Sequence, residues 1–343
     1  MSASTNGGGI SLVQGARGGF VSSQGSGDAE SRLSFVDGLA SSLSVWLDAV
    51  GGTAELGGAP GDALVAGSIE HTGSAPVSLY ISSNGGSGAF ATSDSPATNG
   101  GAASIGPVFA GSARGDVVVE AFAFGGQGGT DGTGGAPGAD GGSVALVDAI
   151  DGSTSGSLSL FQRATGGAGG MSGVTPGRGG DATSLLDVAK SLERLEVRTE
   201  AIAGSGGAPA LPDQAYGIGG NATSSIDARN DGGSVSASSL AWSGYASDGD
   251  AVASGDAMAS GYVILDVEAS TRAPLSGVLN ASGKARIERA RGVSTGGQSV
   301  SVSATLRQGD ASRASGRDGH AAELVNFVEG ETSGALNLEQ HAF

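Results

Sequence analysis

The chain has 343 residues, 66 of them glycine, with 4% aromatic residues and no cysteine. Ordinary soluble domains carry roughly 7% glycine, so this composition argues against an ordinary globular enzyme and allows only a thin core. The net charge of −17 argues against nucleic acid or an anionic membrane surface as the main partner, and the lack of cysteine excludes disulfides and thiolate metal sites.

Residues 1–42 predict a divergent N-terminal coil whose one strand-like segment begins at Ile10. The opening residues lack the charged region and apolar core of a signal peptide. No apolar stretch in the chain approaches the ~20 residues that cross a bilayer. Membrane insertion is therefore not expected.

Residues 43–260 predict a regular repeat. Alternating strands that run into glycine-rich segments begin at residues 43, 77, 117, 157, 196 and 235, which are 34, 40, 40, 39 and 39 residues apart. A second strand precedes each of these and is entered through a glycine and a short residue. These entry steps are Gly61-Asp62-Ala63, Gly101-Ala102-Ala103, Gly142-Ser143-Val144, Gly180-Asp181-Ala182, Gly220-Asn221-Ala222 and Gly255-Asp256-Ala257. Two landmarks with one period indicate tandem units of two strands.

Residues 185–195 also fit a helix, because apolar residues recur there at helical spacing. The repeat nevertheless places the strand pair at this position. Glycine-rich connections, such as residues 125–135 and 166–173, join one unit to the next. Their pattern permits polyproline-II-like strands packed side by side, without requiring them.

Units this small cannot bury a face alone and must stack on their neighbours. The sequence therefore predicts an all-β fold, a β-solenoid of about eight coils with two strands in each ~40-residue coil and glycine-rich connecting loops. Residues 261–343 are expected to form irregular C-terminal coils with an arginine-rich stretch.

Together, the Gly-Gly-Asp-Ala steps and the glycine-rich connections resemble the cysteine-free β-solenoid repeats of bacterial secreted and surface proteins, of the adhesin and autotransporter-passenger kind. The resemblance covers roughly residues 10–310. It implies a secreted or cell-surface location and a structural or adhesive role, although no autotransporter barrel or secretion domain is found in the sequence.

Three aspartates of the entry steps, Asp62, Asp181 and Asp256, are candidate calcium ligands. Clustered carboxylate and carbonyl oxygens suit calcium. The preferred interpretation is an Asx-type turn, in which each side chain bonds its own downstream N–H. Asp148 and Asp187 occupy similar places in successive units and are the candidate acid pair of a polysaccharide-cleaving solenoid.

Five aromatic residues recur late in the strands that begin near residues 43 to 235: Trp46, Tyr80, Phe122, Phe161 and Trp242. They either pack between coils, which is the preferred interpretation, or form an exposed row that stacks on sugars.

A basic stretch includes Arg286, Arg289 and Arg291 and continues through Arg307 to Arg317, with a local charge of +5 over residues 284–317. Such a stretch either binds an acidic partner or is an ordinary solvated face. The three histidines, His71, His320 and His341, are expected to be surface turn residues.

These observations favour a non-enzymatic, extracellular structural or adhesive protein, such as a surface coat, stalk or filament subunit, without a cofactor. The two ends of a stacked rod expose strand edges that recruit further strands. The sequence therefore predicts either end-to-end self-association, which is the preferred interpretation, or a segment of a longer chain. The alternatives are a carbohydrate-binding or carbohydrate-cleaving β-helix, with polysaccharide as partner, and a calcium-stabilised secreted repeat protein.

Overall fold

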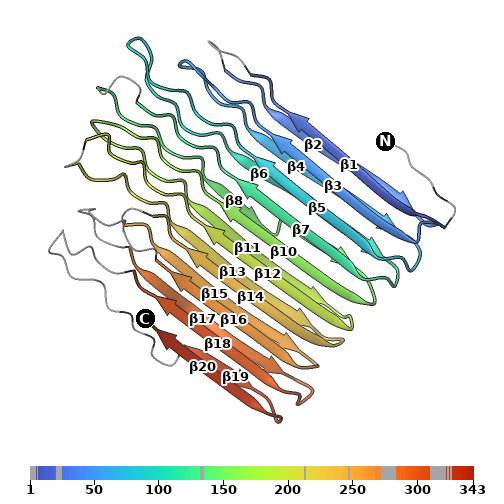
Figure 1. Ribbon diagram of the computed structural model, residues 1–343. Coiled ribbons are helices and arrows are strands. Elements are labelled where there is room, and N and C mark those ends of the chain that lie inside the picture. Colours follow the sequence, from blue (N-terminus) through green and yellow to red (C-terminus); the bar gives the residue numbers. More distant parts are fainter. Residues whose placement is uncertain are drawn as a thin grey trace.

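The protein, seen in a computed structural model, is a flattened β-solenoid in which successive turns stack side by side along one axis (Figure 1). The structure describes residues 5, 7–20, 25–131, 135–211, 214–245, 248–271, 283–309, 322, 324 and 327–343. Over these ranges it contains strands and turns only, and so has no helix that could span a membrane. The predicted all-β solenoid is confirmed.

One broad face is a ten-stranded parallel sheet, to which each turn adds one strand. Its strands, in spatial order, are β1 (Gly9–Arg17), β3 (Ser42–Val50), β5 (Val77–Asn84), β7 (Val117–Phe124), β10 (Ser157–Thr165), β12 (Arg194–Ile202), β14 (Ser234–Trp242), β16 (Val263–Ser270), β18 (Val300–Arg307) and β20 (Leu336–Ala342).

The opposite face is divided into two sheets. The four-stranded sheet contains β2 (Ala29–Asp37), β4 (Ala63–His71), β6 (Ala103–Ser112) and β9 (Ile150–Ser153). The six-stranded sheet contains β8 (Val144–Val147), β11 (Ala182–Lys190), β13 (Ala222–Asn230), β15 (Ala251–Ala259), β17 (Ala285–Ser294) and β19 (Val328–Glu331). The segment open to a helical interpretation is therefore the predicted strand pair, β11 and β12.

The core lies between the two faces and is filled by alternate residues of the strands from β1 to β18. Neighbouring strands pair without slippage across the ten-stranded sheet, so that equivalent residues form columns. One inward column runs from Ile10 through Leu43 and Val77 to Val300 and Leu336. Aliphatic side chains in these columns pack on one another from turn to turn, which is how units too small to fold alone share one core.

The second face divides at Asp148, which lies between β8 and β9 and has a φ of 46°. This left-handed conformation, uncommon for a residue other than glycine, turns the strand so that β8 pairs with β11 while β9 pairs with β6. Opposite the break, the buried Gln162 donates from Nε2 to the carbonyl oxygens of Leu146 and Leu185, at 3.3 and 2.8 Å. The amide thus bonds main-chain groups of both β8 and β11.

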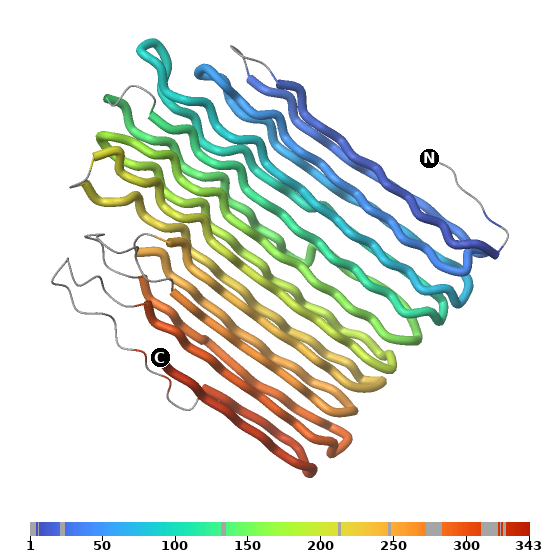
Figure 2. The backbone as a smooth tube through the Cα atoms, viewed as in Figure 1, coloured from blue at the N-terminus to red at the C-terminus, as the bar shows by residue number. Residues whose placement is uncertain are grey.

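The glycine-rich connections are not irregular loops. They form two rows of chain that run beside each other at the end of the strands away from the tight turns (Figure 2). Backbone hydrogen bonds join the two rows through glycine residues. The N–H of Gly142 donates to the carbonyl oxygen of Gly126, that of Gly167 to Gly142, and that of Gly180 to Gly167, each at 2.8 Å. The same zigzag recurs three residues away, where Gly170 donates to Ala139 and Gly177 to Gly170. These hydrogen bonds repeat every three residues and join neighbouring glycine-rich segments. This is the arrangement of polyproline-II-like strands packed side by side that the sequence permitted.

This close approach explains the glycine content. A Cβ atom at Gly126, Gly167 or Gly204 would lie 1.9 Å from a carbonyl oxygen of the preceding turn. Only glycine fits there, as at the axis of collagen. Glycine is required here by the distance between backbones rather than by positive φ.

Candidate functional site

The five predicted aromatic residues all lie on the outer face of the ten-stranded sheet rather than in the core, and four of them contact one another from turn to turn. Trp46 is 50% exposed and the other four are half-buried. They also do not form one row. Trp46, Tyr80 and Phe161 share one column, whereas Phe122 and Trp242 lie in two others.

Four of these rings nevertheless form one patch over β3, β5, β7 and β10, which we call the aromatic patch (Trp46, Tyr80, Phe122 and Phe161). The rings of Trp46 and Tyr80 stack with centroids 5.9 Å apart and planes inclined by 26°. Those of Phe122 and Phe161 meet edge to face at 5.3 Å. Arg198 on β12 lies over the ring of Phe161 and closes one side of the patch with a cation–π contact.

Trp242 lies apart from this patch, on β14, and its indole Nε1 donates to Glu268 at 3.3 Å. It is a partly covered ring that bonds an acid on the next strand. It therefore provides a natural comparison for the exposed Trp46.

The short polar residues of the entry steps also form a column, but their bonding differs from the predicted Asx turn. Each side chain accepts a hydrogen bond from the backbone N–H of the equivalent residue one turn later, rather than from its own downstream N–H. The Oδ1 of Asp62 accepts from Ala102, and that of Asp181 from Asn221, both at 2.7 Å. The side chains thereby tie one turn to the next.

The assignment of Asp256 to this column is wrong. The equivalent residue is Asp250, whose Oδ1 accepts from the N–H of Lys284 at 2.7 Å. Asp256 lies in the middle of β15, where it pairs with Asp227 and Arg291 on the neighbouring strands. The triplet Gly-Asp-Ala occurs twice here, at residues 249–251 and 255–257, and the shorter connection before this turn puts the first of them in the column.

The predicted basic residues meet acids of their own chain. Asp256 lies 2.8 Å from Arg289 and 3.8 Å from Arg291, and Arg286 pairs with Glu288. Arg291 also lies 3.9 Å from the carboxylates of Glu329 and Glu331. Asp256, predicted as a calcium ligand, and Arg289 and Arg291, predicted to bind an acidic partner, thus form one network of ion pairs with each other. Arg313 and Arg317 lie outside the described residues, as does His320.

Next to this network, burial raises the pKa of Asp227, and the charges of Asp256 and Asp187 raise it further. Asp187, Asp227 and Asp256 stand in one column of the six-stranded sheet. Across the ranges that the structure describes, however, no three acidic or histidine side chains come close enough together to hold a metal ion.

Asp148 and Asp187 do lie on successive turns, and the backbone N–H of Asp187 donates to Oδ1 of Asp148 at 2.8 Å. They are on the face opposite the aromatic patch. These acids and aromatic residues therefore do not line one groove, as a carbohydrate-cleaving solenoid would require.

One histidine departs from its expected surface position. His71, at the end of β4, is buried, and its Nδ1 lies 3.2 Å from Oδ2 of Asp37. The backbone N–H of Ala40 is the main cause that lowers the pKa of Asp37. His71 and Asp37 occupy the column that closes the tight turns, where an exposed loop had been expected.

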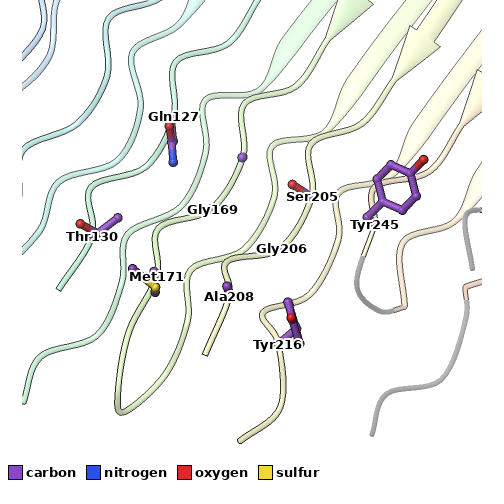
Figure 3. A pocket seen from close by; sticks show the side chains of 10 residues that line it. Gln127, Thr130, Gly169, Met171, Ser205, Gly206, Ala208, Tyr216 and Tyr245 are labelled. Carbon is purple, nitrogen blue, oxygen red and sulfur yellow. The ribbon is translucent and has the colours of Figure 1, made fainter. Parts of the chain in front are cut away.

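A shallow cavity of about 410 Å³ lies over the glycine-rich rows, with Met171, Tyr216 and Tyr245 among its walls (Figure 3). Its other side chains come from positions three residues apart in the rows, such as Gln127 and Thr130. None of the described residues that line it is charged. The sequence did not reveal this cavity, and the only available signal was the three-residue period of the glycine runs.

The two ends of the solenoid differ. At the C-terminal end all seven residues of β20 are exposed, including the inward-facing Leu336 and Leu338 at 48% and 43%. At the N-terminal end Ile10 and Leu12 of β1 are only 6% and 7% exposed. Among the described residues, therefore, none covers the apolar surface of β20 and none pairs with its outer edge.

Comparison with protein-family models, curated proteins and solved structures gave no match. The fold and these surfaces are therefore the basis for assigning a function.

A mutation with a chelation control tests whether the aspartates of the entry-step column bind backbone N–H groups or calcium. Asp181→Ala should destabilise the fold by about 1 kcal/mol, the net contribution of one hydrogen bond, because the N–H of Asn221 loses its acceptor. Asp181→Asn keeps an oxygen acceptor and should cost less. Thermal melting of both variants with and without EDTA checks this, and a fall in the Tm of the parent chain on chelation would show that calcium holds the column instead.

Proposed function

We propose that this protein is a non-enzymatic structural rod of a bacterial surface or secreted layer, and that it assembles end to end into a filament, stalk or coat. The observation that supports this most directly is the exposed β20. In the interior of the sheet the equivalent inward positions are fully buried, as at Val300 and Val302, so covering β20 with another strand would remove apolar surface from water.

The edge strands support the same proposal. Soluble β-proteins protect their free edges with lysine, proline or bulges. Neither β1 nor β20 contains lysine or proline, and both pair with their neighbours without a bulge. Both ends thus offer parallel edges that can continue the ladder.

A lysine placed on the open end tests the proposal. Leu338→Lys should leave folding intact, because Leu338 is already 43% exposed. It should abolish assembly, because docking would bury an unpaired ammonium group. Sedimentation and electron microscopy over a range of concentrations provide the measurement.

The matched control is Asn337→Lys, whose side chain faces outward and would stay in water after docking. This variant should assemble like the parent chain. A parent chain that sediments as a compact monomer at every concentration would refute end-to-end assembly, as would a Leu338→Lys variant that still forms filaments.

The aromatic patch favours a second candidate function, the binding of a polysaccharide. Flat rings that are accessible on one side stack on the apolar faces of sugars, and the patch has hydroxyl and carboxylate groups beside it at Ser82 and Glu120. This function is compatible with a structural rod and would make the assembled surface adhesive.

Affinity electrophoresis in gels that contain hydroxyethyl cellulose tests this binding. The parent chain should be retarded, and the double variant Trp46→Ala/Tyr80→Ala should lose the retardation because both stacked rings are gone. Trp242→Ala, which removes an aromatic residue outside the patch, is the control and should be retarded like the parent. Equal mobility of all three proteins with and without the polymer would exclude this glucan as a ligand.

A further inference from the structure

The register of the ten-stranded sheet identifies the interface through which two copies would join. We propose that β20 of one copy pairs in parallel with β1 of the next copy, with Leu336 opposite Ile10 and Leu338 opposite Leu12. This inference rests on the proposed end-to-end assembly and specifies its contact surface.

The inward residues of the two strands match position by position. In the columns that connect the two ends of the sheet, Leu336 is aligned with Ile10 and Leu338 with Leu12. Ala342 is aligned with Ala16 in the same way. Docking without a shift would therefore extend each apolar column by residues of similar size, whereas a one-residue slip would place every inward side chain on the outer face.

Gln14 and Gln340 also share a column, which elsewhere in the sheet contains glutamine only at Gln162. Each already uses its side-chain amide inside its own turn. Nε2 of Gln14 donates to the carbonyl oxygen of Arg32 at 2.8 Å, and that of Gln340 to Leu324 at 3.4 Å. The two amides would stack across the joint while each keeps the hydrogen bond that its Nε2 donates inside its own turn, as in the glutamine ladders of stacked sheets.

The charged and aromatic groups at the end of these strands are also complementary. Phe343 is 65% exposed, and Arg307 of the preceding strand lies over one face of its ring, 5.2 Å from the centroid. The ring of His341 also stacks on Phe343, with centroids 6.1 Å apart. Arg17 of an incoming copy would occupy the next position of the same column and would bring a second guanidinium group beside this aromatic pair. Glu339, the only carboxylate of β20, would lie opposite Val13 and four residues from Arg17, so it would face no like charge across the joint.

The joint would involve the ten-stranded sheets alone. In chain order each turn contributes a strand of the second face and then a strand of the ten-stranded sheet. β1 is the exception, because in the described residues no strand of the second face precedes it. A notch one strand wide would therefore remain between β19 of one copy and β2 of the next. The joint would bury less surface than an interior turn, so the filament should dissociate on dilution before the rods unfold.

The natural absence of cysteine makes a direct test possible. Ser11 and Asn337 share an outward column, so their Cα atoms would be about 4.8 Å apart across the joint. Single variants Ser11→Cys and Asn337→Cys are mixed under assembly conditions and treated with dibromobimane, which links two adjacent thiols. A crosslinked dimer is expected in the mixture and not with either variant alone.

The offset control replaces Asn337→Cys with His341→Cys, four residues and about 13 Å further along the same strand. The mixture of Ser11→Cys with His341→Cys should give no dimer. If filaments form but the matched pair does not crosslink, or the offset pair crosslinks instead, the proposed register is wrong while end-to-end assembly stands. If the parent chain does not assemble at all, the proposed function itself fails.

Discussion

Gly167→Ala is expected to destabilise the solenoid by ~3 kcal/mol or more, at the upper end of the cost of overpacking. A Cβ atom at this position would lie 1.9 Å from the carbonyl oxygen of Gly126 on the preceding turn. Neither backbone can move away alone, because Gly167 also donates to Gly142 and accepts from Gly180. Relief of the clash would separate two turns along their whole glycine-rich rows.

Gly19→Ala is the matched control. Gly19 begins the same column, which continues through Gly52, Gly86 and Gly126 to Gly167, each facing the carbonyl oxygen of the one before. Nothing lies within 4 Å of a Cβ atom at Gly19 itself. Its stability should change by less than about 1 kcal/mol, because alanine mainly restricts the unfolded chain there. Denaturant unfolding of both variants at equal protein concentration measures the difference. Equal stability would show that the rows separate easily and that glycine is not needed for close approach.

Asn230→Ala is expected to cost about 2–4 kcal/mol, because the buried N–H and C=O groups of Leu192 both lose their partner. Asn230 is fully buried at the end of β13. Its Oδ1 accepts from the N–H of Leu192, and its Nδ2 donates to the carbonyl oxygens of Leu192 and Ser234, each at 3.0 Å. One side chain thereby links the tight turns of two successive units.

Asn84→Ala serves as the comparison for this variant. Asn84 is half-exposed on the outer face of β5 and donates to the nearby hydroxyl of Ser82, so its loss should change stability by less than about 0.5 kcal/mol. Denaturation midpoints and slopes of both variants provide the measurement. A similar small loss for Asn230→Ala would mean that water replaces the amide in the turn.

Strand positions were predictable because the alternation of apolar and polar residues has the period of a strand. Leu195, Val197 and Thr199 face inward in β12 as this pattern indicates. The same alternation could not reveal the depth of the aromatic residues, because a ring on an outer face and one in a second layer have the same spacing. Trp46 and Tyr80 face outward because the next residue of each strand, Leu47 or Ile81, occupies the inward position in the core.

The candidate acids show a second limit of sequence reasoning. Asp62 and Asp181 were correctly placed in one column, yet their partners are N–H groups of the next turn, about 40 residues away in the sequence. Asp256 was misplaced because the Gly-Asp-Ala triplet occurs twice within nine residues, and the earlier copy, at Asp250, is the one that the shorter connection brings into the column. His71 was expected in an exposed turn because nothing nearby in the sequence indicates that Asp37 lies beside it.

Local chemistry by itself determined the strands, the repeat and the need of each unit for neighbours, since strand alternation and scarce apolar bulk are properties of short segments. The tertiary structure alone decided which backbone atoms approach closely enough to require glycine at Gly126 and Gly167, where the second face breaks at Asp148, and which end is left uncovered at Leu336 and Leu338. These features depend on the exact stacking of one turn on the next, which distances along the chain do not specify.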